Sequence, residues 1–213
     1  MKHFLLFALL IVPLLGYTQQ PFEEEIDEFR RSDSVSFPKK GSILFVGSSS
    51  FRLWKTLETD FAKYSVINRG FGGSSLPDVI RYADQIIFPY EPKQVVIYCG
   101  ENDIAGGASA DDVFSRFKTL FTLIREKLPK TNITFVSMKP SPSRYKFFGE
   151  IRKGNNLIRD FLKSQKNTAY VDVFTPMLRK DGRPDESLFV EDMLHMNGKG
   201  YAIWVKALKP SLK

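Results

Sequence analysis

The sequence predicts an α/β fold, a three-layer α/β/α sandwich in which helices cover both faces of a five-stranded parallel sheet. Five short apolar runs, rich in β-branched and aromatic residues, alternate with longer segments of amphipathic helical spacing. The runs are apolar along their whole length, which is typical of parallel strands buried on both faces. With 43% hydrophobic and 26% charged residues among 213, the composition is that of one globular domain and excludes disordered and fibrous proteins.

The chain begins with a pattern typical of export signals. Residues 1–3 are Met-Lys-His, an apolar run follows over 4–15, and small residues stand at 16 and 18. This pattern predicts a secretory signal peptide over residues 1–18 and export to the periplasm or out of the cell. An uncleaved membrane anchor is the alternative, although twelve apolar residues fall short of the roughly 20 that span a bilayer. We expect no stable membrane anchor after cleavage.

Residues 19–40 are expected to form an N-terminal helix and a linker. Over 22–34 acidic residues precede basic ones, and Ile26 and Phe29 stand three apart, which indicates a helix that packs loosely on the rest. A proline and a glycine near the end of this segment stop the helix. The main domain is expected over residues 41–213.

The main domain starts with a strand over residues 42–47, the run Ser-Ile-Leu-Phe-Val-Gly. Pro77 fits the first turn of a later helix, and Pro129 ends another. Further strands are expected over residues 64–68, 94–99, 132–137 and 169–173, with helices over 51–58, 77–87, 111–128, 150–164 and 198–208. Because a helix separates each strand from the next, the strands are expected to run parallel.

Glycines and small polar residues follow three of the expected strands. They form Gly47-Ser-Ser-Ser50 after the first strand, a run with three glycines over 68–75 after the second, and Gly100-Glu-Asn-Asp103 after the third. Open parallel sheets bind ligands in the crevice at the carboxyl ends of their strands. These three blocks are therefore the first candidates for a functional site.

His195 is the only histidine outside the predicted signal peptide, and it follows Asp192 by three residues. An imidazole is the common side chain whose ordinary pKa lies near neutrality, so His195 is the candidate general base. The carboxylate of Asp192 would fix its tautomer and stabilise its charged form. An Asp-x-x-His also arises often by chance, and a surface turn that carries both residues is the alternative.

Taken in order, these three blocks and the segment that carries Asp192 and His195 resemble the four blocks of the SGNH or GDSL hydrolases, and the resemblance covers residues 41–208. It implies a flavodoxin-like sheet and a serine hydrolase that acts on esters. It also implies a role for five residues: a triad of the nucleophile Ser49 with Asp192 and His195, and an oxyanion hole made by the backbone amides of Ser49 and Gly73 and the side chain of Asn102.

One position departs from the pattern of that family. Its first block commonly reads Gly-Asp-Ser, and here Ser48 stands in the aspartate position. This acid is not a member of the family's triad, so its loss leaves the catalytic groups in place but changes the hydrogen bonding around Ser49. By register with the block, Ser49 is the nucleophile and Ser50 begins the following helix.

The same residue types suit acyl transfer on physical grounds. A serine hydroxyl holds negligible alkoxide at neutral pH and needs a base in hydrogen-bond contact, for which His195 is the candidate. Donors aimed at the carbonyl oxygen stabilise the charge that it gains as the carbon becomes tetrahedral. Structural alternatives remain open for two of the donors: Gly73 as a turn residue that needs a positive φ, and Asn102 as a turn residue bonded to its own backbone.

Other classes of site do not fit the sequence. Phe51 stands at the last position of the Gly-x-Ser-x-Gly elbow of α/β-hydrolases, and Ser75 stands where a dinucleotide fingerprint needs its third glycine. One histidine and one cysteine cannot assemble a zinc site of usual composition, so we expect no cofactor and no metal. Cys99 is expected to be a buried structural thiol. The formal charge of +7 is scattered along the chain, which argues against a nucleic-acid partner.

The loop after the fourth strand, residues 139–148, is expected to border the crevice. Arg144, Tyr145 and Trp54 are the candidate substrate contacts, and packing of the aromatic side chains into the core is the alternative. The expected substrate is a small-molecule or saccharide ester with a short acyl group, such as acetyl on a carbohydrate. Alternatives are a lysophospholipase or thioesterase of the same family, or a catalytically silent carbohydrate-binding module on the same fold.

Overall fold

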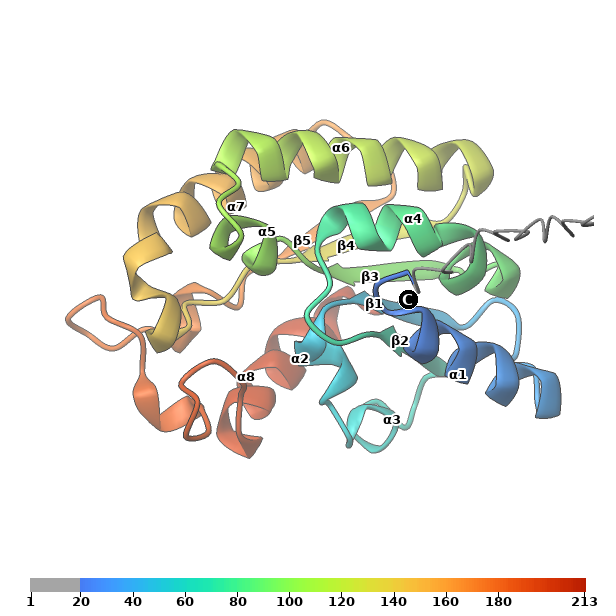
Figure 1. Ribbon diagram of the computed structural model, residues 1–213, viewed down its shortest axis with the longest axis horizontal. Helices are drawn as coiled ribbons and strands as arrows, with labels where there is room; N and C mark the ends of the chain where they lie inside the picture. The colour runs from blue at the N-terminus through green and yellow to red at the C-terminus, as the bar shows by residue number, and fades with distance from the viewer. Residues whose placement is uncertain (1–19) are drawn as a thin grey trace, which may run out of the picture.

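The computed structural model describes residues 20–213, so the predicted signal peptide lies outside the described residues. Figure 1 shows a sheet between two layers of helices. Its strands are β1 Ile43–Gly47, β2 Val66–Gly70, β3 Gln94–Tyr98, β4 Asn132–Val136 and β5 Thr168–Val171, in the order β2-β1-β3-β4-β5. All neighbouring pairs are parallel. This is the flavodoxin-like strand order, so the predicted three-layer sandwich is confirmed.

The sheet carries a separate hydrophobic core on each face. In β1, Leu44 and Val46 belong to one core and Ile43 and Phe45 to the other, because successive side chains of a strand point to opposite faces. No helix within residues 20–213 combines the length and hydropathy needed to cross a membrane. One core lies under α1 Glu23–Val35, α4 Leu76–Ile86, α6 Ala110–Lys127 and α7 Phe148–Lys163, and the other under α2 Ser49–Arg52, α3 Leu57–Asp60 and α8 Gly198–Leu208.

The single helix expected over residues 51–58 is wrong, because α2 and α3 replace it. Trp54 lies in the turn between these two short helices and is 2% exposed. Its ring packs on Phe61 with 5.5 Å between the centroids, and its indole N–H donates to Asp60 Oδ2 at 2.7 Å. Burial of so large a ring with its N–H satisfied outweighs the helical preference of the segment.

Strand β2 lies two residues later than the expected range of 64–68. The apolar pattern ends at Asn68, but the side chain of Asn68 donates to the Phe51 carbonyl at 2.7 Å and Arg69 forms an ion pair with Asp33. These partners satisfy the polar groups of the edge strand, so the strand continues past the end of the apolar run.

Helix α1 is firmly docked, and the expectation that it packs loosely is wrong. Ile26 is 1% exposed, and the Phe22 ring meets the edge of Phe71 with 5.3 Å between the centroids. Glu25 Oε2 also accepts the backbone amide of Gly72 at 2.9 Å. The helix is therefore attached to the loop that follows β2.

The substitution Ile26→Ala is expected to lower the free energy of unfolding by about 2–4 kcal/mol, since it removes a buried side chain and leaves a cavity. Urea unfolding followed by circular dichroism measures the change. Val35→Ala at the exposed end of the same helix, 88% exposed, is the control and should change stability by less than about 0.5 kcal/mol. Equal stability of Ile26→Ala and the unsubstituted protein would show that α1 does not contribute to the core.

Candidate active site

Three strand ends and the loop before α8 meet at one edge of the sheet. Ser49 is the first residue of α2 after β1, Gly73 follows β2, and Asn102 lies in the short helix α5 Glu101–Ala105 after β3. In Figure 1 this edge faces left, with α5 above and α8 below. Parallel strands place their carboxyl ends together, so the blocks that are far apart in sequence become neighbours.

Gly47 sets the position of Ser49. The φ of Gly47 is +136°, and a Cβ at this residue would lie 2.0 Å from the Tyr98 carbonyl oxygen of β3. The next amide, that of Ser48, donates to the same oxygen at 2.9 Å. Glycine is therefore required where β1 ends against β3, and the chain turns there so that Ser49 begins α2.

Ser49, His195 and Asp192 form a continuous chain of hydrogen bonds. Ser49 Oγ lies 3.0 Å from His195 Nε2, and His195 Nδ1 lies 2.5 Å from Asp192 Oδ2. Ser49 and His195 are 146 residues apart in the sequence. The fold thus brings together the three residues predicted from the sequence. Their hydrogen bonds run from a hydroxyl through an imidazole to a carboxylate.

The Asp-x-x-His segment is itself a tight turn, as the structural alternative had it, and its imidazole faces Ser49. Asp192 Oδ1 accepts the backbone amides of Leu194 and His195, each at 2.8 Å. The His195 carbonyl accepts the Val190 amide at 2.9 Å, which closes the loop. The turn and the triad are therefore one structure, because the carboxylate that orients the imidazole also folds the backbone around it.

Asp192 is held in its charged form. Partial burial of its carboxyl alone would raise its pKa, but hydrogen bonds from the backbone and side chain of His195 and from the Leu194 amide outweigh this effect. Together they lower the pKa of Asp192 to about 2. A carboxylate that is ionised at neutral pH keeps the proton on His195 Nδ1, which leaves the lone pair of Nε2 toward the Ser49 hydroxyl.

The two backbone amides that the sequence predicts for an oxyanion hole, those of Ser49 and Gly73, are free to bind a ligand. Within residues 20–213, neither the Ser49 nor the Gly73 amide donates to a protein acceptor. Gly73 has a φ of +68°, and a Cβ there would meet no atom within 4 Å. Glycine is therefore required at 73 for its backbone conformation, which agrees with the turn interpretation, and the open space beside it leaves its amide accessible.

The Asn102 side chain lies between the loops that carry these amides. Its Nδ2 donates to Ser48 Oγ at 2.7 Å and to the Ser74 carbonyl at 3.0 Å. Ser48 precedes Ser49 and Ser74 follows Gly73, so the Asn102 amide group bonds the chain neighbours of both residues. The departure at Ser48 has a direct consequence here, because a neutral hydroxyl accepts from Asn102 where the family pattern has a carboxylate.

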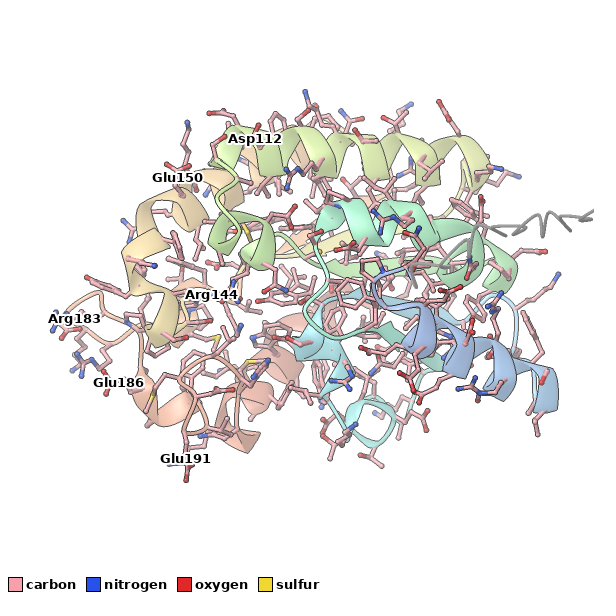
Figure 2. All side chains as sticks on the ribbon, in the orientation of Figure 1. Asp112, Arg144, Glu150, Arg183, Glu186 and Glu191 are labelled. Carbon is pink, nitrogen blue, oxygen red and sulfur yellow. The ribbon has the colours of Figure 1, made fainter. Side chains whose placement is uncertain are left out.

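The three predicted substrate contacts lie in different surroundings. Trp54 is in the core, so its prediction as a substrate contact is wrong, because the turn after α2 buries its ring. Arg144, 17% exposed, donates to the Glu101 carbonyl and to Asn102 Oδ1. Tyr145 is 46% exposed. Tyr145 lines a cavity of about 230 Å³ together with Pro142, Arg179, Arg183, Pro184 and Glu186. In Figure 2 Arg183 and Glu186 lie on the outer loop and Arg144 nearer the centre.

A buried ion pair joins α5 to the segment after β4, and the sequence analysis did not predict it. Lys139 Nζ lies 2.7 Å from Glu101 Oε2, and both side chains are less than a tenth exposed. Burial alone would raise the pKa of Glu101, but Lys139 and the hydroxyl groups of Ser141 and Tyr98 hold it below its ordinary value. The available signal was that opposite charges follow β3 and β4, whose carboxyl ends are neighbours in the sheet.

Cys99 is a structural thiol. It is fully buried in the core under α4 and α6, and burial raises the pKa of its thiol well above the ordinary value. Its Sγ lies 3.5 Å from the Ser74 carbonyl. It is therefore a packing residue, as expected from the sequence, and not a nucleophile.

Comparison of the sequence with protein-family models gives one family. The model of the GDSL-like lipase/acylhydrolase family matches residues 41–203, which is most of the chain. A comparison with curated proteins finds no match.

Solved structures with the same fold are numerous, and their sequence identities are low. A Streptococcus pneumoniae protein whose name refers to platelet activating factor is 20% identical, with a TM-score of 0.79 over 89% of this chain and 92% of its own. A GDSL-like lipase from Bacteroides thetaiotaomicron is 21% identical, with a TM-score of 0.73 over 87% and 96%. A catalytic mutant of an acetylxylan esterase from Geobacillus stearothermophilus is 14% identical, with a TM-score of 0.65 over 80% and 94%. These similarities concern the fold.

Proposed function

The chain belongs to the GDSL-like lipase/acylhydrolase family, and we propose that within it this protein is an exported serine esterase that removes short acyl groups, such as acetyl, from a carbohydrate. Family membership makes it a hydrolase of ester bonds. The observation that carries the proposal is the chain of hydrogen bonds from Ser49 Oγ through His195 to Asp192. Export rests on the signal pattern of residues 1–18 alone.

Acylation starts at Ser49. As Ser49 Oγ attacks the carbonyl carbon of the ester, His195 Nε2 takes the hydroxyl proton, and the ionised Asp192 stabilises the resulting imidazolium. The carbonyl oxygen gains the negative charge and accepts hydrogen bonds from the oxyanion hole. The imidazolium then gives its proton to the leaving alcohol oxygen, the carbon–oxygen bond breaks, and the acyl group remains on Ser49.

Deacylation repeats these steps with water. His195 takes a proton from a water molecule as the water oxygen attacks the acyl carbon, and the oxyanion forms in the same place. The imidazolium returns the proton to Ser49 Oγ when the second tetrahedral species collapses. The products are the free acid and the regenerated hydroxyl, and no cofactor enters either half of the reaction.

Two features support a short acyl group on a polar alcohol. The turns that follow β1 and β2 consist largely of glycines and serines. The triad is also open, with 26% of the His195 side chain and 47% of the Asp192 side chain exposed. An open site of small residues admits an acyl group carried on a bulky hydrophilic molecule, whereas long acyl chains need an apolar groove to bury them. One structural relative, at 14% identity, is an acetylxylan esterase.

The specificity part is tested with p-nitrophenyl esters of increasing chain length, followed by acetylated xylo-oligosaccharides. We expect kcat/KM to fall steadily from acetate through butyrate to octanoate, and acetate to be released from the oligosaccharides. Ser49→Ala is the control for background hydrolysis. A rate that rises with chain length would replace this assignment by a lysophospholipase or thioesterase.

The substitution Asn102→Ala is expected to lower kcat by about 10²–10³-fold, because it removes one donor to the oxyanion. Its KM should change little, since the bond forms mainly in the transition state. Asn156→Ala on α7, outside the crevice, is the matched control. An unchanged kcat in Asn102→Ala would exclude Asn102 from the oxyanion hole.

A further inference from the structure

We propose that Arg144 is a positioning residue of the oxyanion hole, which fixes the orientation of the Asn102 side-chain amide and polarises it, and does not bind the substrate. The inference rests on the proposed function, because it assigns a role in the same reaction. It also replaces the substrate contact that the sequence suggested for Arg144.

The argument starts from the two ends of the Asn102 side chain. The oxygen and nitrogen of a carboxamide are alike in size, so the hydrogen bonds around them decide which end points where. Arg144 carries only donors, so the atom that faces its guanidinium has to be the oxygen. Its Nη2 donates to Asn102 Oδ1 at 2.8 Å. The Nδ2 end is thereby turned toward Ser48 and Ser74, the neighbours of the other two oxyanion donors.

Arg144 is itself held in place by the backbone and by the buried charges. Its Nη1 donates to the carbonyl of Glu101, the residue before Asn102, at 2.8 Å. The guanidinium therefore bonds both the backbone and the Asn102 side chain of the same turn. The carboxylate of Glu101 lies 3.9 Å from Arg144 Nε. A planar fork of donors suits this two-point contact, which the single ammonium of lysine cannot reproduce.

The Glu101 carboxylate has two cationic neighbours, Lys139 and Arg144, and Arg144 also contacts Asn102. Lys139 approaches the Glu101 carboxylate to 2.7 Å, closer than the 3.9 Å of Arg144, so the anion is matched mainly by Lys139. The guanidinium charge therefore acts largely on Asn102 Oδ1. A hydrogen bond from a cation at the oxygen of an amide draws electron density from its nitrogen and strengthens the N–H groups as donors.

Ser48 makes this control necessary. Both hydrogens of Asn102 Nδ2 are bonded, one to Ser48 Oγ and one to the Ser74 carbonyl. The hydrogen on Ser48 is the one that can pass to the oxyanion, because Ser48 is adjacent to Ser49. A bond to a neutral hydroxyl is then exchanged for a stronger bond to an anion, while Arg144 and Ser74 keep the amide from rotating.

The test is a double-mutant cycle on p-nitrophenyl acetate. Arg144→Met keeps the length of the side chain and removes its donors and charge, and it is expected to lower kcat by about 10–100-fold with KM changed less than about twofold. In the Asn102→Ala background the same substitution should cost less than about twofold, because the group on which Arg144 acts is already gone. Arg159→Met on α7, where Arg159 pairs with the neighbouring Asp160, is the matched control and should keep the kcat of the unsubstituted protein.

Chemical rescue gives a second readout that a merely structural role would not move. Added guanidinium should restore part of kcat to Arg144→Ala but none to Arg144→Ala/Asn102→Ala. Arg144→Lys keeps the charge and the aliphatic part of the side chain, so its kcat should lie between those of the unsubstituted protein and Arg144→Met. If Arg144→Met does not fold, Arg144→Lys replaces it in the double-mutant cycle.

Three results would overturn the inference: a full kcat in Arg144→Met, a rise in KM at constant kcat, or an equal loss in both backgrounds of the cycle. Either of the last two results would indicate that Arg144 binds the substrate directly. Failure of the proposed function is a separate result, because Ser49→Ala would then hydrolyse the ester as fast as the unsubstituted protein, whatever Arg144 does.

Discussion

Ser49→Ala is expected to lower kcat for p-nitrophenyl acetate by about 10⁴–10⁶-fold, which is the loss that removal of a nucleophile causes in a serine triad. The substitution removes the only atom that forms the acyl-enzyme, and neither neighbouring hydroxyl has a base in contact. In the structure the hydrogen bond to His195 Nε2 belongs to Ser49 Oγ. Steady-state release of p-nitrophenol measures the change, with circular dichroism to confirm that the fold is kept.

The run of three serines supplies the matched control. Ser50 follows the nucleophile in α2 and is only 2% exposed. Ser50→Ala therefore tests the loss of a hydroxyl one residue away from Ser49. Its kcat should stay within a few-fold of the unsubstituted protein. An inactive Ser50→Ala together with an active Ser49→Ala would show that Ser50, and not Ser49, is the nucleophile.

His195→Ala is expected to cost as much as Ser49→Ala, about 10⁴–10⁶-fold in kcat, because the two residues act as one unit. The only other histidine in the sequence lies at position 3, within the predicted signal peptide. In a protein produced without residues 1–18, no second imidazole can therefore take over the proton from Ser49. The double variant Ser49→Ala/His195→Ala should be no slower than either single variant.

Glu191→Ala is the control for the loop that carries His195. Glu191 is exposed, precedes Asp192 and lies at the lower edge of the molecule in Figure 2. The substitution tests whether a change in the loop alone affects the rate, and kcat should be unchanged. If His195→Ala retained full activity, the general base would have to be another group, and the mechanism would be wrong.

The elements that the sequence predicted best are those specified by local patterns. The five strands could be predicted because each contains a short apolar run and is followed by a glycine or a polar turn. The roles of Ser49, Asn102 and His195 came from the resemblance of their blocks to those of the SGNH or GDSL hydrolases, and the parallel strands put the ends that carry these blocks together. Their contacts follow from the topology and not from distances along the chain.

The predictions that failed depend on contacts between distant segments. Trp54 has an aromatic side chain near the nucleophile in sequence, but its ring packs against Tyr201 and Trp204 of α8, far along the chain. Arg144 was correctly placed in a loop at the crevice, but its bond to Asn102 depends on the fold of that loop against α5. The docking of α1 likewise depends on Ile26 and Glu25 meeting segments far along the chain.

The most direct test of the account is covalent trapping of the nucleophile. The mature protein is treated with a fluorophosphonate, which phosphonylates an activated serine, and the peptide that carries Ser48, Ser49 and Ser50 is fragmented by mass spectrometry. We expect one label per chain, on Ser49 Oγ, and no label in His195→Ala, where the hydroxyl has lost its base. A label on Ser48 or Ser50, or esterase activity that survives complete labelling of Ser49, would contradict the account.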